Sequence, residues 1–168
     1  MYKYLLYFLI FSFLGWCAEV IFYLFKTGRF VNRGLGFGPV CPIYGIGISL
    51  SAALLQGIDS FVLLSLFSMA IATSVELLVG FLSDRFLEER LWDYSGEKGN
   101  ILGYVCPRFS LIWGITCAVI IKLLPLLEPL INVLDTPFFK ASAFVVFTAV
   151  MVDERVAVMK SKKKAISR

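Results

Sequence analysis

The sequence contains no histidine, and this absence removes whole classes of chemistry. Ser-His and Cys-His nucleophilic mechanisms and histidine metal sites are excluded within the chain. No G-x-x-x-x-G-K-[ST] phosphate loop is present either, so the chain cannot hydrolyse ATP by that route alone. The four cysteines form no C-x-x-C pair. Cys17, Cys41 and Cys106 fall near the side predicted below to be cytoplasmic, where disulfides are not expected.

Charged residues are also scarce, at 17% against 59% hydrophobic residues, which is typical of a membrane protein. A membrane-spanning helix needs about 20 mostly apolar residues. The sequence supplies about five such stretches, so we expect an all-α integral membrane bundle of about five transmembrane helices. The expected spans, within a single transmembrane domain over residues 1–152, are residues 4–25, 39–56, 61–81, 109–127 and 137–152.

The basic residues predict the orientation. All but three of the 16 Lys and Arg residues lie in segments 26–38, 82–108 and 153–168, whereas the connections 57–60 and 128–136 hold none. By the positive-inside rule the N-terminus faces outward and the C-terminus faces the cytoplasm. We therefore expect a multi-pass protein of the bacterial cytoplasmic membrane.

Residues 153–168 form a basic cytoplasmic tail that includes the run KSKKKAISR. The expected partners of this tail, beside the bilayer itself, are anionic lipid headgroups. Nucleic acid is not an expected partner, because no aromatic platform or folded soluble module accompanies the basic run.

The motif Val-Cys-Pro occurs twice, at 40–42 and 105–107, and each copy follows a span with one glutamate. Glu19 and Glu76 each lie about 22 Å along their span at about 1.5 Å per residue, in the cytoplasmic half of the membrane. The pattern predicts two parallel helix-pair repeats, spans 1–2 and spans 3–4, related by an axis along the membrane normal, plus one further helix. The alternative is that the motif recurs by chance.

Two connecting segments have unusual sequences. Residues 32–45 read NRGLGFGPVCPIYG, and non-helical backbone at membrane depth must be buried in protein or line a wet cavity. This segment is either a re-entrant or tightly folded entry to span 2, with amides free to face a ligand, or a simple cytoplasmic turn. Residues 83–95 carry apolar residues at helical spacing after Ser83, which predicts a cytoplasmic interfacial helix.

Glu19 and Glu76 are the leading candidates for functional residues. Each lies in an apolar run, where an isolated charge costs at least about 2.5 kcal/mol. One alternative is that each pairs with a nearby arginine, such as Arg33 or Arg85; another is that each is a neutral acid hydrogen-bonded to backbone.

Other residues could support these two acids. The tryptophans are predicted interfacial anchors, except Trp92, whose following polar loop could fold back onto the glutamates. Cys41 and Cys106 could supply thiolates to a metal, although no paired motif supports this. Arg33 and Arg108 are better placed as anion binders or as counter-ions to the glutamates.

The motifs FSFLGWCAEV, NRG, GPVCPIYG, ELLVG, ERLWDYS, NILG and FSLIWG occur in that order. Together they resemble the bacterial family of putative ABC transporter permeases, also called CmpB-like or type IV. The resemblance covers about residues 8–114 and implies a small polytopic membrane protein with a transport-related role. The resemblance implies a ligand-binding site made of Glu19, Asn32, Arg33, Tyr44, Glu76, Glu88, Trp92, Asp93 and Asn100. We add Arg108 to these candidate site residues.

The first functional hypothesis is transport. A cytoplasm-facing cavity lined by Glu19 and Glu76 would bind a cation or a cationic or zwitterionic small solute, with no cofactor, in a homodimer or together with a separate ATPase. The second is an intramembrane enzyme acting on a lipid or isoprenoid phosphate headgroup, in which Glu76, Glu88 and Asp93 hold a divalent metal. The third is a regulatory membrane subunit whose polar residues hold helices together.

Overall fold

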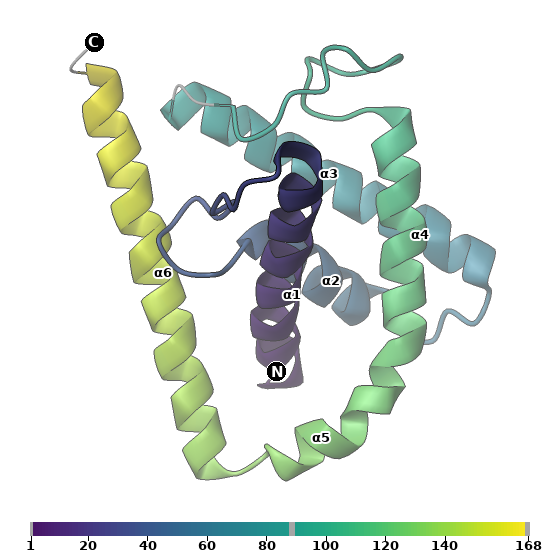
Figure 1. The fold of residues 1–168 in the computed structure, drawn as a ribbon. Helices are drawn as coiled ribbons and strands as arrows, with labels where there is room; N and C mark the ends of the chain where they lie inside the picture. The colour runs from purple at the N-terminus through teal and green to yellow at the C-terminus, as the bar shows by residue number, and fades with distance from the viewer. Residues whose placement is uncertain (1, 88–89, 167–168) are drawn as a thin grey trace. The chain divides into compact units, whose positions relative to one another are not determined.

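The computed structural model describes residues 2–87 and 90–166, with side chains in the last segment described as far as residue 162. Nearly all of its regular structure is helical, which confirms the all-α class (Figure 1). The elements are α1 (Tyr2–Thr27), α2 (Pro42–Leu54), α3 (Phe61–Leu87), α4 (Pro107–Leu123), the 3₁₀ helix η1 (Leu124–Leu127), α5 (Glu128–Val133) and α6 (Pro137–Ile166).

Three helical segments are long and apolar enough to cross a membrane: Tyr2–Thr27, Phe61–Leu87 and Pro107–Val133. The protein is therefore a helical membrane protein. The second expected span corresponds to α2, which is apolar but has only 13 residues. That α2 and α6 also cross the bilayer stays a prediction.

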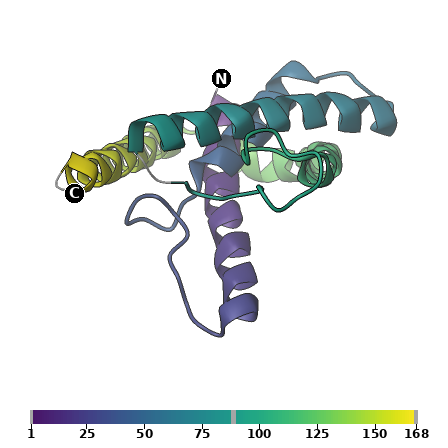
Figure 2. The same cartoon turned by 90° about the horizontal axis from the view of Figure 1, so that it is seen from above.

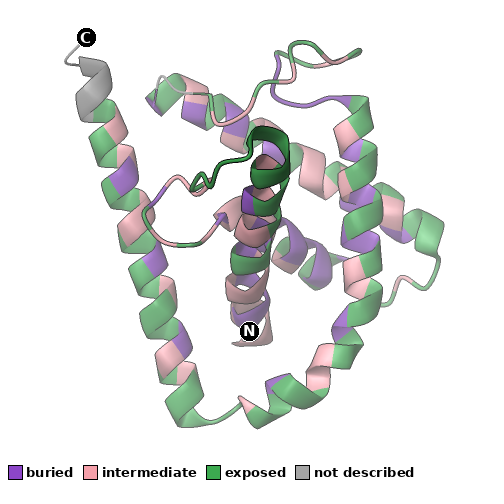
Figure 3. Ribbon diagram, viewed as in Figure 1, coloured by how far each residue is buried: buried purple, intermediate pink, exposed green. Residues whose placement is uncertain are grey.

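Many helical residues are exposed (Figure 3), and many of these exposed residues are large and apolar. Phe25 is 87% exposed, Leu126 74% and Val145 69%. Such residues would be unfavourable in water but suit contact with hydrocarbon, where backbone groups are satisfied within the helices. The buried polar groups are therefore the informative exceptions.

The chain divides into two compact units. Residues 47–129 form the second unit, in which α3 and α4 pack side by side. Leu64 is 1% exposed and Ala118 0% at this contact, and Leu55 joins their cluster. Gly114 of α4 faces Met69 and the backbone of α3 so closely that an added Cβ would overlap them.

Residues 1–46 and 130–168 form the first unit. Phe8 of α1 and Phe147 of α6 meet edge to face, with ring centroids 5.5 Å apart. The loop 28–41 runs from the end of α1 back along that helix (Figure 2). It is fixed at its far end by the Cys41 amide, which donates to the Ser12 carbonyl at 2.9 Å. The glycine-rich segment is thus a folded entry to α2 that packs on its own unit.

The prediction of a separate interfacial helix over residues 83–95 is wrong in the described residues. Residues 83–87 are the last turn and a half of α3, and residues 90–95 have no helical structure. Ser83 does not act as an N-cap, because its hydroxyl donates to the Gly80 carbonyl within α3. The apolar spacing instead reflects the buried side of α3, where Ser83 and Leu87 are 5% and 6% exposed.

The last expected span and the basic tail are continuous in the structure, because α6 runs without interruption from Pro137 to Ile166. No glycine or proline follows Pro137 to end the helix. Within the described side chains, the Lys160 ammonium lies 4.3 Å from the centroid of the Phe37 ring. The basic residues 160–164 therefore continue the helix α6.

Candidate functional site

The first glutamate is partly exposed and paired. Glu19 of α1 accepts a hydrogen bond from the hydroxyl of Tyr44, on the first turn of α2, at 2.6 Å. The Arg33 Nε lies 3.6 Å from the other carboxylate oxygen, and the two side chains are 26% and 30% exposed. The Arg33 guanidinium also lies 4.1 Å from the centroid of the Tyr23 ring. We call Glu19, Tyr44 and Arg33 the Glu19 site; it is an ion pair partly screened by solvent.

Asn32 organises the glycine-rich loop. Its Oδ1 accepts hydrogen bonds from the Trp16 indole at 2.7 Å and from the Gly34 amide at 3.1 Å. Its Nδ2 donates to the carbonyls of Gly36 and Phe37 at 3.3 and 3.4 Å. The side chain thereby satisfies the backbone of an irregular segment, which is the ordinary role of an Asn turn.

One amide of the same loop binds a carboxylate of α6. The Gly38 amide donates to Asp153 Oδ2 at 2.8 Å. An added Cβ on Gly36 would overlap the same Asp153 carboxylate. The expectation that the loop amides are free to face a ligand is therefore wrong for Gly38, because an acid 115 residues further along the chain occupies its amide.

The second glutamate is deeply buried. Glu76 of α3 is 5% exposed. Its Oε1 accepts hydrogen bonds from the Tyr94 hydroxyl at 2.9 Å and from the Trp113 indole of α4 at 3.2 Å. Its Oε2 is buried and has no hydrogen-bond partner among the described residues. We call Glu76, Tyr94 and Trp113 the Glu76 site.

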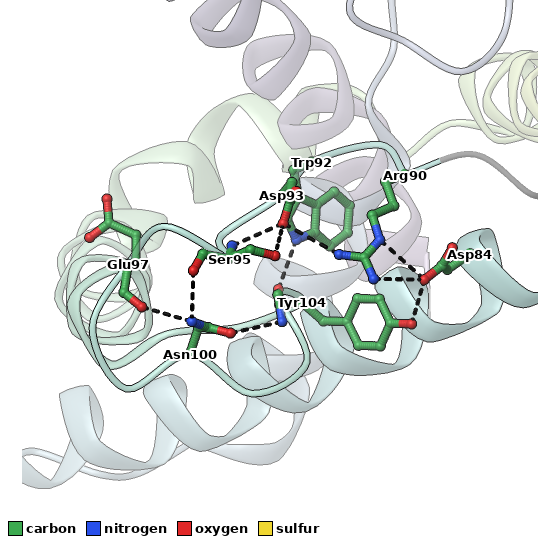
Figure 4. Close-up of polar contacts among 9 residues, drawn as sticks. Asp84, Arg90, Trp92, Asp93, Ser95, Glu97, Asn100 and Tyr104 are labelled. Atoms are coloured by element: carbon green, nitrogen blue, oxygen red, sulfur yellow. Dashed lines mark hydrogen bonds and ion pairs between the residues drawn. The ribbon is translucent and has the colours of Figure 1, made fainter.

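The loop of residues 90–104 places the Tyr94 hydroxyl beside Glu76. Figure 4 shows polar contacts that hold this loop. Asp84, near the end of α3, accepts hydrogen bonds from the Tyr104 hydroxyl at 2.7 Å and from Arg90 Nε at 3.2 Å. Arg90 also lies 3.4 Å from Asp93. The Trp92 indole donates to the Tyr104 carbonyl at 2.8 Å. The loop thus folds back on itself and on α3.

Two further residues complete this loop. Asn100 donates to the carbonyls of Ser95 and Glu97 and accepts from the Gly103 amide. The Tyr94 ring stacks on Phe109 at a centroid distance of 4.6 Å and an interplanar angle of 12°. The Tyr94 hydroxyl is therefore held in place by its ring as well as by the loop.

The Asp93 carboxylate gives a pH-dependent prediction for this loop. The Ser95 hydroxyl and the Ser95 amide donate to Asp93, and with Arg90 they hold its pKa below the ordinary value of 3.8. Because the folded-state pKa is lowered, Asp93 stabilises the loop above its unfolded pKa, and this contribution is lost as pH falls through the folded pKa. In ¹³C NMR of the Asp93 carboxyl, we expect a titration midpoint below 3.8.

Replacing Ser95 by alanine should raise that midpoint, because one of the two serine donors is removed. Ser142→Ala is a matched control, since the Ser142 hydroxyl only bonds the Phe138 carbonyl within α6. An Asp93 midpoint that stays the same in Ser95→Ala would show that the loop is not held by these bonds.

The two glutamate sites share a local design. In each unit an aromatic residue followed by glycine donates to the glutamate: Tyr44-Gly45 in one, Trp113-Gly114 in the other. Both glycines pack against the residues seven and eleven positions before the glutamate on its helix. These contacted residues are Ser12 and Phe8 in the first unit, and Met69 and Ser65 in the second. The recurrence supports the predicted repeat, whose superposition stays a prediction.

The predicted site residues thus separate by unit. Glu19, Tyr44, Arg33 and, through its loop, Asn32 come together, while Trp92, Asp93 and Asn100 build the loop that carries Tyr94 to Glu76. Arg108 lies 3.4 Å from Glu97 and is 69% exposed. Glu88 lies outside the described residues. That Glu19 and Glu76 line one cavity stays a prediction.

The sequence did not indicate the roles of two site residues. Trp113 was expected to anchor at the interface, although the shared aromatic-glycine pair could have indicated its role as a donor. Tyr104 had no periodic signal, whereas Tyr94 lies in the polar loop that was expected to fold back onto the glutamates. All four cysteines are free, and no group of three His, Cys, Asp or Glu residues in the described part of the chain could hold a metal ion.

One comparison with known proteins is informative. The profile of the family described as "Putative ABC-transporter type IV" matches residues 6–158. The chain belongs to this family. The family match extends beyond the expected resemblance and into helix α6, as far as residue 158. The type IV family places the chain among ABC-transporter-related membrane proteins. The comparisons with curated proteins and with solved structures gave no match.

Proposed function

We propose that the protein is a transport component that binds a cation, or a small cationic or zwitterionic solute, at Glu76. The observation that carries the proposal is the state of this side chain. It is 5% exposed in an apolar helix, and its Oε2 has no hydrogen-bond partner among the described residues. Buried polar groups are normally hydrogen-bonded. A buried oxygen without a hydrogen-bond partner, on a side chain held in a fixed orientation, therefore suits a ligand.

The surroundings of Glu76 support a positively charged ligand. Its two partners, Tyr94 and Trp113, donate to one oxygen and hold the carboxyl group in a fixed orientation. Neither partner carries a positive charge, and no lysine or arginine in the described part of the chain forms an ion pair with Glu76. A positively charged ligand would therefore supply the counter-charge that the described residues around Glu76 do not.

The Glu19 site supports a different role. Arg33 already neutralises Glu19, and both side chains are partly exposed. We assign it to holding the entry of α2 against α1. The predicted topology places both glutamates in the cytoplasmic half of the membrane. Since the chain has no phosphate loop, transport driven by ATP would require a separate ATPase subunit.

Calorimetric titration of the purified full chain in detergent tests the proposal. The probes are sodium, potassium, methylammonium and glycine, which cover inorganic cations, an organic cation and a zwitterion. We expect saturable binding of at least one probe. Failure of all four to bind would contradict this assignment of ligand class.

A further inference from the structure

The two glutamates differ in how their charge is compensated. Glu19 has a guanidinium at 3.6 Å, a hydroxyl donor at 2.6 Å and 30% exposure to solvent. Glu76 has two neutral donors on one oxygen, no described cationic partner and 5% exposure. An ionised carboxylate in such surroundings is costly, because neither water nor a counter-ion offsets its desolvation.

The elements packed around Glu76 offer no charge to change this. The loop contributes Tyr94, and α4 contributes Trp113. On α3 itself, the next acid is Asp84, which is already bound by Arg90 and Tyr104. Arg108 on α4 lies against Glu97 instead. Tyr94 is therefore the only titratable group among the described residues that the structure shows bonded to Glu76.

We infer that Glu76 holds a proton at rest and releases it when a cation binds. The inference rests on the proposed function and deepens it by naming the second substrate, a proton. On binding, the O–H bond of the carboxylic acid breaks, the proton passes to water, and the cation takes its place beside the carboxylate. When the cation is monovalent, its single positive charge replaces that of the proton, so the buried site is neutral in both states.

The geometry suits this exchange. Tyr94 and Trp113 hold Oε1 as acceptor, which leaves Oε2 to carry either the proton or the cation without moving the side chain. A neutral acid is far cheaper to bury than a carboxylate. The site can therefore stay closed and apolar while empty of cation, and the cation has to compete with a proton.

Infrared difference spectroscopy of the full chain at neutral pH tests the inference. We expect the C=O stretching band of a buried, protonated carboxylic acid, and we expect Glu76→Gln to lose it completely. Asp59→Asn is the matched control, since Asp59 is fully exposed and removal of its charge should leave the band in place. Absence of the band in wild type, or its persistence in Glu76→Gln, would overturn the inference.

A second arm separates this inference from the proposed function. Adding sodium, potassium or methylammonium should remove the band and release about one proton per bound cation into weakly buffered solution. Cation binding without loss of the band and without proton release would overturn the exchange while leaving cation binding intact. If no cation binds and the band therefore persists in wild type, both the exchange and the proposed function are refuted. Only the protonation of Glu76 at rest would then remain supported.

Discussion

Replacing Glu76 by glutamine should strongly weaken binding of the cationic ligand while leaving the protein folded. Glutamine keeps the size of the side chain and an oxygen that can accept from Tyr94 and Trp113, but it cannot carry a negative charge. Hydrogen bonds to charged groups contribute about 1.5–3 kcal/mol. We therefore expect affinity to fall by about tenfold to more than a hundredfold in the calorimetric titration, with a change in unfolding free energy below about 1 kcal/mol.

Glu19→Gln should give the opposite pattern. It leaves Arg33 without its carboxylate partner, so stability should fall, though only modestly because both side chains are partly exposed to solvent. Ligand affinity should stay unchanged. Asp59→Asn, at a fully exposed position, should change neither property. Equal loss of affinity in Glu19→Gln and Glu76→Gln would show that both acids contact the ligand and would favour the shared cavity.

Gly45→Ala and Gly114→Ala should both destabilise the protein strongly. A Cβ on Gly45 would overlap the Phe8 carbonyl and the Ser12 hydroxyl, and a Cβ on Gly114 would overlap Met69 and the Ser65 carbonyl. Alanine favours a helix over glycine by about 1 kcal/mol, but overpacking costs about 1–3 kcal/mol or more where the neighbouring atoms are backbone. We expect net losses of up to about 2 kcal/mol in unfolding free energy, measured by denaturant titration in mixed micelles.

Gly47→Ala provides the control on the same helix as Gly45. Nothing described lies within 4 Å of a Cβ at Gly47, so helix propensity alone should make this change neutral or stabilising. If the two sites are copies of one design, the two destabilising substitutions should have similar effects. Tolerance of alanine at either Gly45 or Gly114 would argue against equivalent packing in the two units.

The sequence predicted the helices well because they depend on local composition. Long apolar runs indicated α1, α3 and α4. In the structure, Pro42 and Pro107 are the first residues of α2 and α4, a position that proline favours. The recurrence of Val-Cys-Pro and the single glutamate in each of α1 and α3 also pointed to the two sites. These signals are properties of short stretches of chain.

The errors concern contacts between distant residues. Residues 83–95 have the apolar spacing of a helix, but the Trp92 indole bonds a carbonyl twelve residues away and Asp84 binds Tyr104 twenty residues away. Likewise, the loop amide of Gly38 meets Asp153 from α6. Periodicity carries no information about such pairs, so tertiary contacts overrode the local preference.

The most direct test of the account is an experimental structure of the wild-type protein saturated with whichever probe binds in the titration. We predict density for that ligand in contact with Glu76 Oε2, with Tyr94 and Trp113 still bonded to Oε1. Ligand density at another place, with Glu76 enclosed only by its own protein neighbours, would contradict the assignment of Glu76 as the binding group.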